Sequence, residues 1–119
     1  VVGEGAGDLA TATALSRAVL RGAMEALLEN APRDRNVTGA AGVNLLLELG
    51  YLCGGWLMGK AALRAVEQLA GGRGDRAFLE AKRVTARFYF EHLLPRAAAC
   101  HAAVTAGPDA LMALTPEQF

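Results

Sequence analysis

The sequence predicts an all-α protein, an up-down-up, four-helix-bundle-like fold made of three long helices and a short C-terminal one. Apolar residues recur every three to four positions over long stretches, which is the period of an amphipathic helix. Proline and paired glycines separate these stretches, and the short connections between them favour antiparallel neighbours. With 119 residues, 53% of them hydrophobic, the chain has the size of one domain spanning residues 1–119.

The first helix is expected over residues 8–30. Leu9, Leu20 and Leu27 fall on its broad apolar face, and a stripe of charged residues at a spacing of four lies on the other. Residues 32–38 begin with a proline and form a polar surface connection. Residues 3–7, GEGAG, are expected to be a flexible linker, because a dinucleotide-binding glycine motif requires a preceding strand.

The second helix is expected over residues 39–70, and it contains the most apolar run of the chain, VNLLLELGYLCGGWLM at 43–58. Glu48 lies in the middle of this run, with Asn44 and Lys60 at its two ends. A membrane-spanning helix needs about 20 predominantly apolar residues, and a carboxylate at its centre is costly. We therefore expect no membrane span here, but a helix surrounded by neighbouring helices.

Glycines inside this helix must have a structural reason, since each costs about 1 kcal/mol relative to alanine. Gly54-Gly55 predicts a kink or a close contact. The pairs Gly50/Gly54 and Gly55/Gly59 repeat at a spacing of four, which permits close approach of a neighbouring backbone. Aromatic residues between and beside them could instead form a protein interface. The candidate packing or interface residues are Tyr51, Gly54, Gly55, Trp56 and Gly59.

The third helix is expected over residues 75–106, with Asp75 as its N-cap and a bend at Pro95. The period places one set of residues on its inner face: Phe78, Ala81, Thr85, Phe88, Tyr89 and His92. A short fourth helix is expected over residues 109–114 after Gly107-Pro108, and Thr115-Pro116 is expected to start a final turn.

Charge and cysteine content exclude several classes of protein. The 12 basic and 12 acidic side chains give a net charge of zero without a basic cluster, so no nucleic-acid partner is expected. Cys53 and Cys100 have neither disulfide-framework nor metal-site spacing, and reduced thiols in the cytoplasm are expected. The chain starts at Val1 without an initiator methionine and shows no signal peptide, so we expect a fragment excised from a longer polypeptide.

Four ionisable residues are candidates for chemical sites. Glu48 could be a catalytic base, but a carboxylate at a helix edge that meets an arginine or a backbone donor is favoured. His92 could be a general acid or base, but without a nearby nucleophile a histidine at the edge of the core is favoured. Cys100 and His101 diverge by about 100° on a helix, so no metal site is expected there.

Four segments carry a resemblance to a known family: GYLCGGWLMGKAAL at 50–63, AKRVTARFYFEHLLPR at 81–96, AAVTAG at 102–107 and ALMAL at 110–114. In this order and separation they resemble the C-terminal accessory domain of large bacterial acyl-CoA dehydrogenases. The resemblance extends from the first helix to the end of the chain.

The resemblance implies a parent polypeptide that acts in fatty acid metabolism and oxidises acyl-CoA to 2,3-enoyl-CoA, with FAD as hydride acceptor and a glutamate as base. This chain lacks the flavin-binding and catalytic-base regions. No catalytic, cofactor-binding or metal residue is therefore carried over, and neither Glu48 nor Glu91 is assigned as the base. The resemblance implies a structural layer on the catalytic body of its own polypeptide, in a homo-oligomer whose substrate is acyl-CoA.

Two other interpretations remain open at this point. The chain could be a free-standing interaction or dimerisation module that uses Trp56, Tyr51 and the glycine ridges. It could also be a small enzyme in its own right, although the sequence offers no convergent polar cluster.

Overall fold

The computed structural model describes residues 2–119, and side chains from residue 11 onward except those of residues 12 and 13. Within residues 2–119 the structure contains helices and turns and no strand, so the predicted all-α class is confirmed. Its elements in order are α1 (Val2–Asn30), α2 (Arg35–Ala70), α3 (Arg76–Phe88), the π-helical turn η1 (Tyr89–Leu93), α4 (Arg96–Val104) and the 3-10 turn η2 (Pro116–Gln118).

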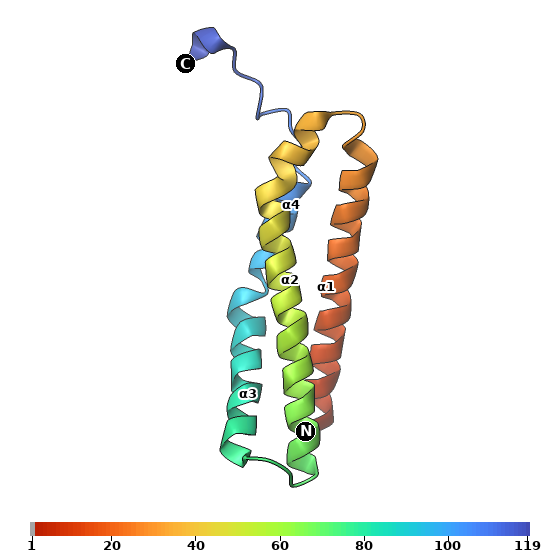
Figure 1. Ribbon diagram of the computed structural model, residues 1–119, viewed down its shortest axis with the longest axis vertical. Helices are drawn as coiled ribbons and strands as arrows, with labels where there is room; N and C mark the ends of the chain where they lie inside the picture. The colour runs from red at the N-terminus through yellow and green to blue at the C-terminus, as the bar shows by residue number, and fades with distance from the viewer. Residues whose placement is uncertain (1) are drawn as a thin grey trace.

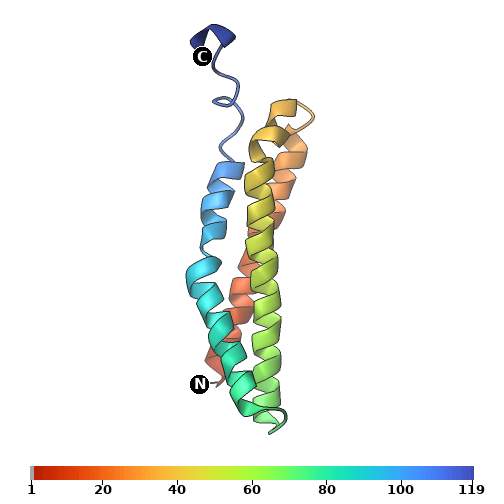
Figure 2. The ribbon, with the colours of Figure 1, turned by 60° about the vertical axis from the view of Figure 1, so that its left-hand side comes forward.

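The central element is α2, with α1 antiparallel to it along one side and α3 followed by α4 along the other (Figures 1 and 2). This is the expected up-down-up arrangement. The molecule measures 68 × 28 × 19 Å, and its radius of gyration is 19.1 Å. A compact chain of this length would have a radius of gyration of about 13.5 Å, so the bundle is long and thin.

The predicted starts of the first two helices were wrong. Helix α1 begins at Val2 and includes the glycine-rich stretch expected to be a linker. Glycine only weakens a helix, by about 1 kcal/mol each, and no proline interrupts this stretch. Helix α2 begins at Arg35 because Asp34 caps it, accepting a hydrogen bond of 2.9 Å from the Asn36 amide.

The N-cap predicted at Asp75 is confirmed, because its carboxylate accepts hydrogen bonds from the amides of Ala77 and Phe78 at 2.9 and 3.3 Å. Replacing Asp75 by alanine should lower the free energy of unfolding by about 1 kcal/mol, since two amides at the start of α3 lose their acceptor. Urea denaturation followed by circular dichroism measures this loss. Asp75→Ser is the matched control and should stay within about 0.5 kcal/mol of the wild type, because serine also caps helices.

The third predicted helix is divided into α3, η1 and α4 at Pro95. Proline has no amide hydrogen and its ring clashes with the carbonyl four residues earlier. The chain accommodates this with a π turn, in which the Leu94 amide donates to the Tyr89 carbonyl at 2.9 Å, and α4 then starts at Arg96. The predicted interruption at Pro95 is confirmed, but it divides the helix instead of only bending it.

The short helix predicted over residues 109–114 is absent, and these residues form turns that extend beyond the end of the bundle (Figure 1). Their side chains are exposed, so no packing supports a helix that would be too short to form alone. The final turn at Thr115-Pro116 does form, as η2.

The hydrophobic core consists mainly of small side chains. The buried apolar residues are Ala23, Ala41, Leu52, Ala62, Ala65, Leu79, Ala86, Ala97 and Val104. The largest fully buried side chain among the described residues belongs to Glu48, whereas many leucines, valines and phenylalanines are exposed. The helices of this bundle are therefore held close together, and much of their apolar surface faces outward.

Among the described residues, α2 alone is long and apolar enough to cross a membrane by length and composition. In the structure it packs against α1 on one side and against α3 and α4 on the other. Its carboxylate at Glu48 is enclosed by these neighbours.

Candidate functional site

A buried glutamate–histidine pair joins α2 to α4. Glu48 of α2 is fully buried, and its Oε1 lies 3.1 Å from Nδ1 of His101 in α4. The other oxygen, Oε2, is buried with no hydrogen-bond partner among the described residues. The expectation that Glu48 lies at a helix edge and meets an arginine or a backbone donor was wrong. The core is built mainly from small side chains, and α4 places His101 beside Glu48.

The pair links two helices and offers little to a substrate. The contact between Oε1 and Nδ1 gives one oxygen of the buried carboxyl group a hydrogen-bond partner, which lowers the cost of its burial. Because Glu48 is 0% exposed, no substrate atom can reach it in this structure. No group of three or more metal-ligating side chains occurs in the described part of the chain. The pair is therefore a structural link between α2 and α4.

A second contact between helices fills the space over Gly54 and Gly55. The Tyr89 hydroxyl donates a hydrogen bond of 3.0 Å to the Tyr51 carbonyl, and burial raises the pKa of Tyr89, so the phenol stays a donor. A Cβ atom on Gly54 would touch the Tyr89 hydroxyl and lie 2.8 Å from Tyr89 Cζ. A Cβ on Gly55 would lie 2.9 Å from a methyl carbon of Leu94. The two glycines thus allow η1 to lie directly on α2.

The remaining candidate interface residues have different surroundings. Gly59 is buried, and Tyr51 is half-buried. Trp56 is exposed and lies beneath the Lys60 ammonium, which is 4.6 Å from the ring centroid. A groove of about 350 Å³ between α1 and α2 adjoins it, lined by Ser16, Arg17, Leu20, Leu52, Cys53 and Trp56. The interface role of these residues stays a prediction.

The predicted inner face of the third helix was wrong except at Tyr89. The residues that α3 and η1 turn toward α2 include Leu79 and Ala86, while Phe78 and Phe88 are exposed. His92, expected at the edge of the core, has a side chain that is 60% exposed and contacts the Phe88 ring at 4.8 Å. This helix carries two apolar stripes. The prediction chose the stripe with Phe78 and Phe88, and the bundle buries the stripe with Leu79 and Ala86.

The surroundings of the Glu91 carboxylate do not suit a general base. Its Oε1 accepts a hydrogen bond of 2.7 Å from Arg87 Nε on the helix surface, and this hydrogen bond lowers the pKa of the Glu91 carboxyl. A base that works near neutral pH needs a pKa shifted upward, which is the opposite direction. The pair Arg87–Glu91 is a solvated contact between successive turns.

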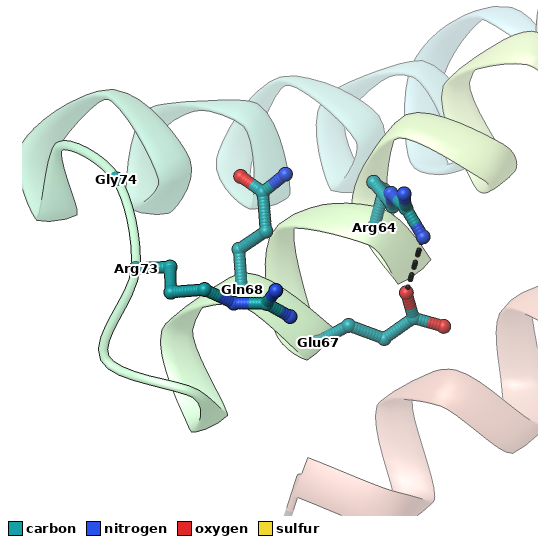
Figure 3. A pocket seen from close by; sticks show the side chains of 5 residues that line it. All are labelled: Arg64, Glu67, Gln68, Arg73 and Gly74. Carbon is teal, nitrogen blue, oxygen red and sulfur yellow. Dashed lines mark hydrogen bonds and ion pairs between the residues drawn. The ribbon is translucent and has the colours of Figure 1, made fainter.

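A small hollow of about 240 Å³ lies where α2 turns toward α3 (Figure 3). Its lining consists of Arg64, Glu67, Gln68, Arg73 and Gly74. Arg64 Nη1 is bonded to Glu67 Oε2 at 3.1 Å, and both side chains are largely exposed. The residues that line the hollow are largely exposed, and none of them is a buried group that would orient a ligand.

Comparisons with known proteins agree with the resemblance described above. The family model for the acetyl-CoA dehydrogenase C-terminal-like domain matches residues 3–115. A 3-methylmercaptopropionyl-CoA dehydrogenase from Ruegeria pomeroyi is 36% identical over 110 residues, which is 92% of this chain. The chain spans only 18% of the length of that relative. This helical chain belongs to the family of acetyl-CoA dehydrogenase C-terminal-like domains, the C-terminal domains of acyl-CoA dehydrogenases.

Proposed function

We propose that this chain is the C-terminal structural layer of an FAD-dependent dehydrogenase that oxidises acyl-CoA to 2,3-enoyl-CoA in bacterial fatty acid metabolism. In this proposal it packs on the catalytic body of its own polypeptide and contributes to a homo-oligomer in the cytoplasm. Family membership and the name of the relative support the enzyme class. Two free cysteines, Cys53 and Cys100, fit a reducing compartment.

The observation that carries the structural role is the amount of large apolar surface that faces outward. Leu28, Leu46 and Val84 are each about 70% exposed, while the core is built mostly from alanine. Soluble monomers rarely expose large contiguous apolar patches, and such patches mark interaction sites. Surfaces of this kind on α1, α2 and α3 favour a domain that is covered by other protein on several sides.

The described residues do not fit a flavin. The two grooves along α1 have volumes of about 350 and 380 Å³ and are lined largely by exposed side chains, among them Arg17 and Glu25. A cofactor as large as FAD needs a concave site that buries most of its surface and holds its phosphates on backbone amides. We therefore expect FAD on the catalytic body, and no step of the oxidation is assigned to this chain.

The proposal is tested on the parent polypeptide with and without this domain. We expect deletion of the domain to change the oligomer size and to lower the melting temperature by about 5 °C or more, because apolar surface on the catalytic body becomes exposed. Light scattering and thermal unfolding measure the two effects, and turnover of an acyl-CoA substrate is followed in parallel. Unchanged oligomer size, melting temperature and turnover would refute the structural role.

An alternative is a free-standing module for protein–protein interaction or dimerisation. The groove beside Trp56 favours it, since tryptophan and arginine are enriched where interfaces gain most of their energy. The gene upstream of this segment distinguishes the two functions. A reading frame that continues into a dehydrogenase body supports the structural layer, and a start codon just before Val1 supports the module.

A further inference from the structure

The C-terminal tail, which we define as residues 105–119, extends beyond the end of the bundle where α1 joins α2 (Figures 1 and 2). The turn η2 within the tail packs against no helix of the structure. The large apolar side chains of the tail are each more than half exposed, and they are Leu111, Met112, Leu114 and Phe119. The tail therefore carries apolar surface that the described chain does not cover.

The tail nevertheless has ordered turns of its own. The Leu111 amide donates to the Pro108 carbonyl at 2.9 Å. The Thr115 amide donates to the Gln118 side chain at 2.8 Å, and the Gln118 amide donates back to the Thr115 carbonyl at 3.0 Å. A segment that already holds its turns loses less conformational entropy when it binds. The tail is therefore suited to dock as a preformed segment.

The charges of the tail define the surface that it fits. Its charged side chains are Asp109 and Glu117, and they stand on the two sides of the apolar run 110–114. No basic residue occurs between residues 105 and 119. An apolar run between two carboxylates fits an apolar hollow that has cations beside it, because opposite charges then meet across the contact.

The groove between α1 and α2 beside Trp56 has this complementary character. Leu20, Leu52 and Trp56 give it apolar walls. Arg17 also lines it, and the Lys60 ammonium lies 4.6 Å from the centroid of the Trp56 ring. Its volume of about 350 Å³ lies in the range of pockets that enclose apolar groups.

No carboxylate near this groove opposes an acidic tail. Between residues 14 and 24 of α1, and between residues 49 and 66 of α2, every charged residue is basic. The other two hollows described above contain Glu67 and Glu25. The outward face of α2 offers no cation between residues 36 and 59. Among these surfaces of the described chain, the groove beside Trp56 therefore fits the tail best.

The tail of the same chain is directed away from this groove. Helix α4 ends at Val104, which packs beside Ala41 of α2. Leu52 and Trp56 lie about 16–22 Å farther along the axis of α2, at 1.5 Å per residue. The tail leaves α4 in the opposite direction and uses part of its length in turns (Figure 2). A groove on a second copy is therefore the available one.

We propose that two copies of this chain exchange their tails. The apolar run 110–114 of each copy lies in the groove beside Trp56 of the other, and Asp109 and Glu117 lie near Arg17 and Lys60 of that copy. Such a reciprocal exchange is a closed two-fold contact. The inference names a contact for the homo-oligomer proposed above, on which it rests, and it needs no dehydrogenase chemistry.

The first test uses Trp56 as the reporter, because it is the one tryptophan of the chain. A chain that ends at Gly107 loses only exposed residues beyond Pro108, so its bundle should stay intact. A synthetic peptide of residues 108–119 contains neither tryptophan nor tyrosine. Added to the shortened chain, it should change the Trp56 fluorescence saturably, with a dissociation constant of about 100 μM or lower.

Matched variants show whether the apolar run and the cations cause this binding. A peptide with Leu111→Ser and Leu114→Ser should produce no saturable change, because its apolar side chains are lost. Arg17→Glu in the shortened chain should raise the dissociation constant at least about threefold, since it places a carboxylate beside the acidic peptide. Arg76→Glu on α3 is the control for the change of charge and should leave the dissociation constant unchanged.

The second test is the association of the full 119-residue chain. Sedimentation equilibrium should show a dimer for the full chain and a monomer for the chain that ends at Gly107. Trp56→Ala should raise the dissociation constant of the dimer at least about tenfold. Phe78→Ala is the matched control, because Phe78 is also exposed and lies beneath a lysine, Lys82, at 4.9 Å. That variant should remain dimeric.

Three results would overturn the exchange. The peptide could leave the Trp56 fluorescence unchanged up to about 1 mM, or the serine peptide could bind as well as the native one. The full chain could remain monomeric at about 100 μM. The full chain could be a monomer that rejects the peptide while the shortened chain binds it, which would place the tail in its own groove.

The outcomes also separate this exchange from the proposed function. If the peptide does not bind while deletion of the whole domain still disturbs the parent enzyme, the exchange fails alone. If the tails mediate a dimer of this chain while deletion of the domain changes neither oligomer size, melting temperature nor turnover, the proposed function fails alone.

Discussion

Replacing His101 by leucine is expected to lower the free energy of unfolding by about 3 kcal/mol. His101 is the one hydrogen-bond partner of the Glu48 carboxylate among the described residues, and the carboxylate is fully buried. Removing one partner of a buried pair leaves an uncompensated charge, which typically costs 3–5 kcal/mol. The lower end applies because the His101 side chain is 35% exposed, so water reaches part of the site. Urea denaturation near neutral pH measures the loss.

A double-mutant cycle identifies the cause of this loss. Glu48→Leu alone should cost about 1 kcal/mol, since His101 can still be hydrated, and Glu48→Leu with His101→Leu should recover most of the stability. His92→Leu is the matched control and should change stability by no more than about 0.5 kcal/mol, because that histidine is 60% exposed. Additive single effects would show that Glu48 and His101 do not depend on each other.

The helices could be predicted from the sequence because their signals are local. The period of apolar residues, the cap at Asp75 and the interruption at Pro95 each act within one or two helical turns, and all three appear in the structure. The pairing of Glu48 with His101 joins residues 53 positions apart. It depends on the register between α2 and α4, which no local pattern specifies.

The face of α3 was predicted wrongly for a related reason. Phe78 and Phe88 form one apolar stripe of this helix, and Leu79 and Ala86 belong to another. Either stripe satisfies the helical period, and the bundle itself buries the second. A chain that also packs on other protein carries more apolar faces than its own core uses. The period of apolar residues then predicts the helix, but it does not predict which face is buried inside the chain.

Replacing Gly54 by alanine is expected to lower the free energy of unfolding by about 2 kcal/mol, although alanine is the better helix former. The added Cβ would touch the Tyr89 hydroxyl and lie 2.8 Å from Tyr89 Cζ, so η1 would have to move away from α2. That movement also stretches the hydrogen bond from Tyr89 to the Tyr51 carbonyl. Thermal and urea unfolding of the single variant measure the net effect.

The comparison that isolates the Gly54 contact uses one glycine with open surroundings and one change of the opposing side chain. Gly22→Ala on α1 should raise stability by about 1 kcal/mol, since its Cβ meets nothing within 4 Å. In a Tyr89→Phe background the nearest opposing atom is gone, so Gly54→Ala should cost about 1 kcal/mol less than in the wild type. If Gly54→Ala stabilised the chain as Gly22→Ala does, η1 would not lie directly on α2. A contact outside this chain would then be the reason for the glycines at positions 54 and 55.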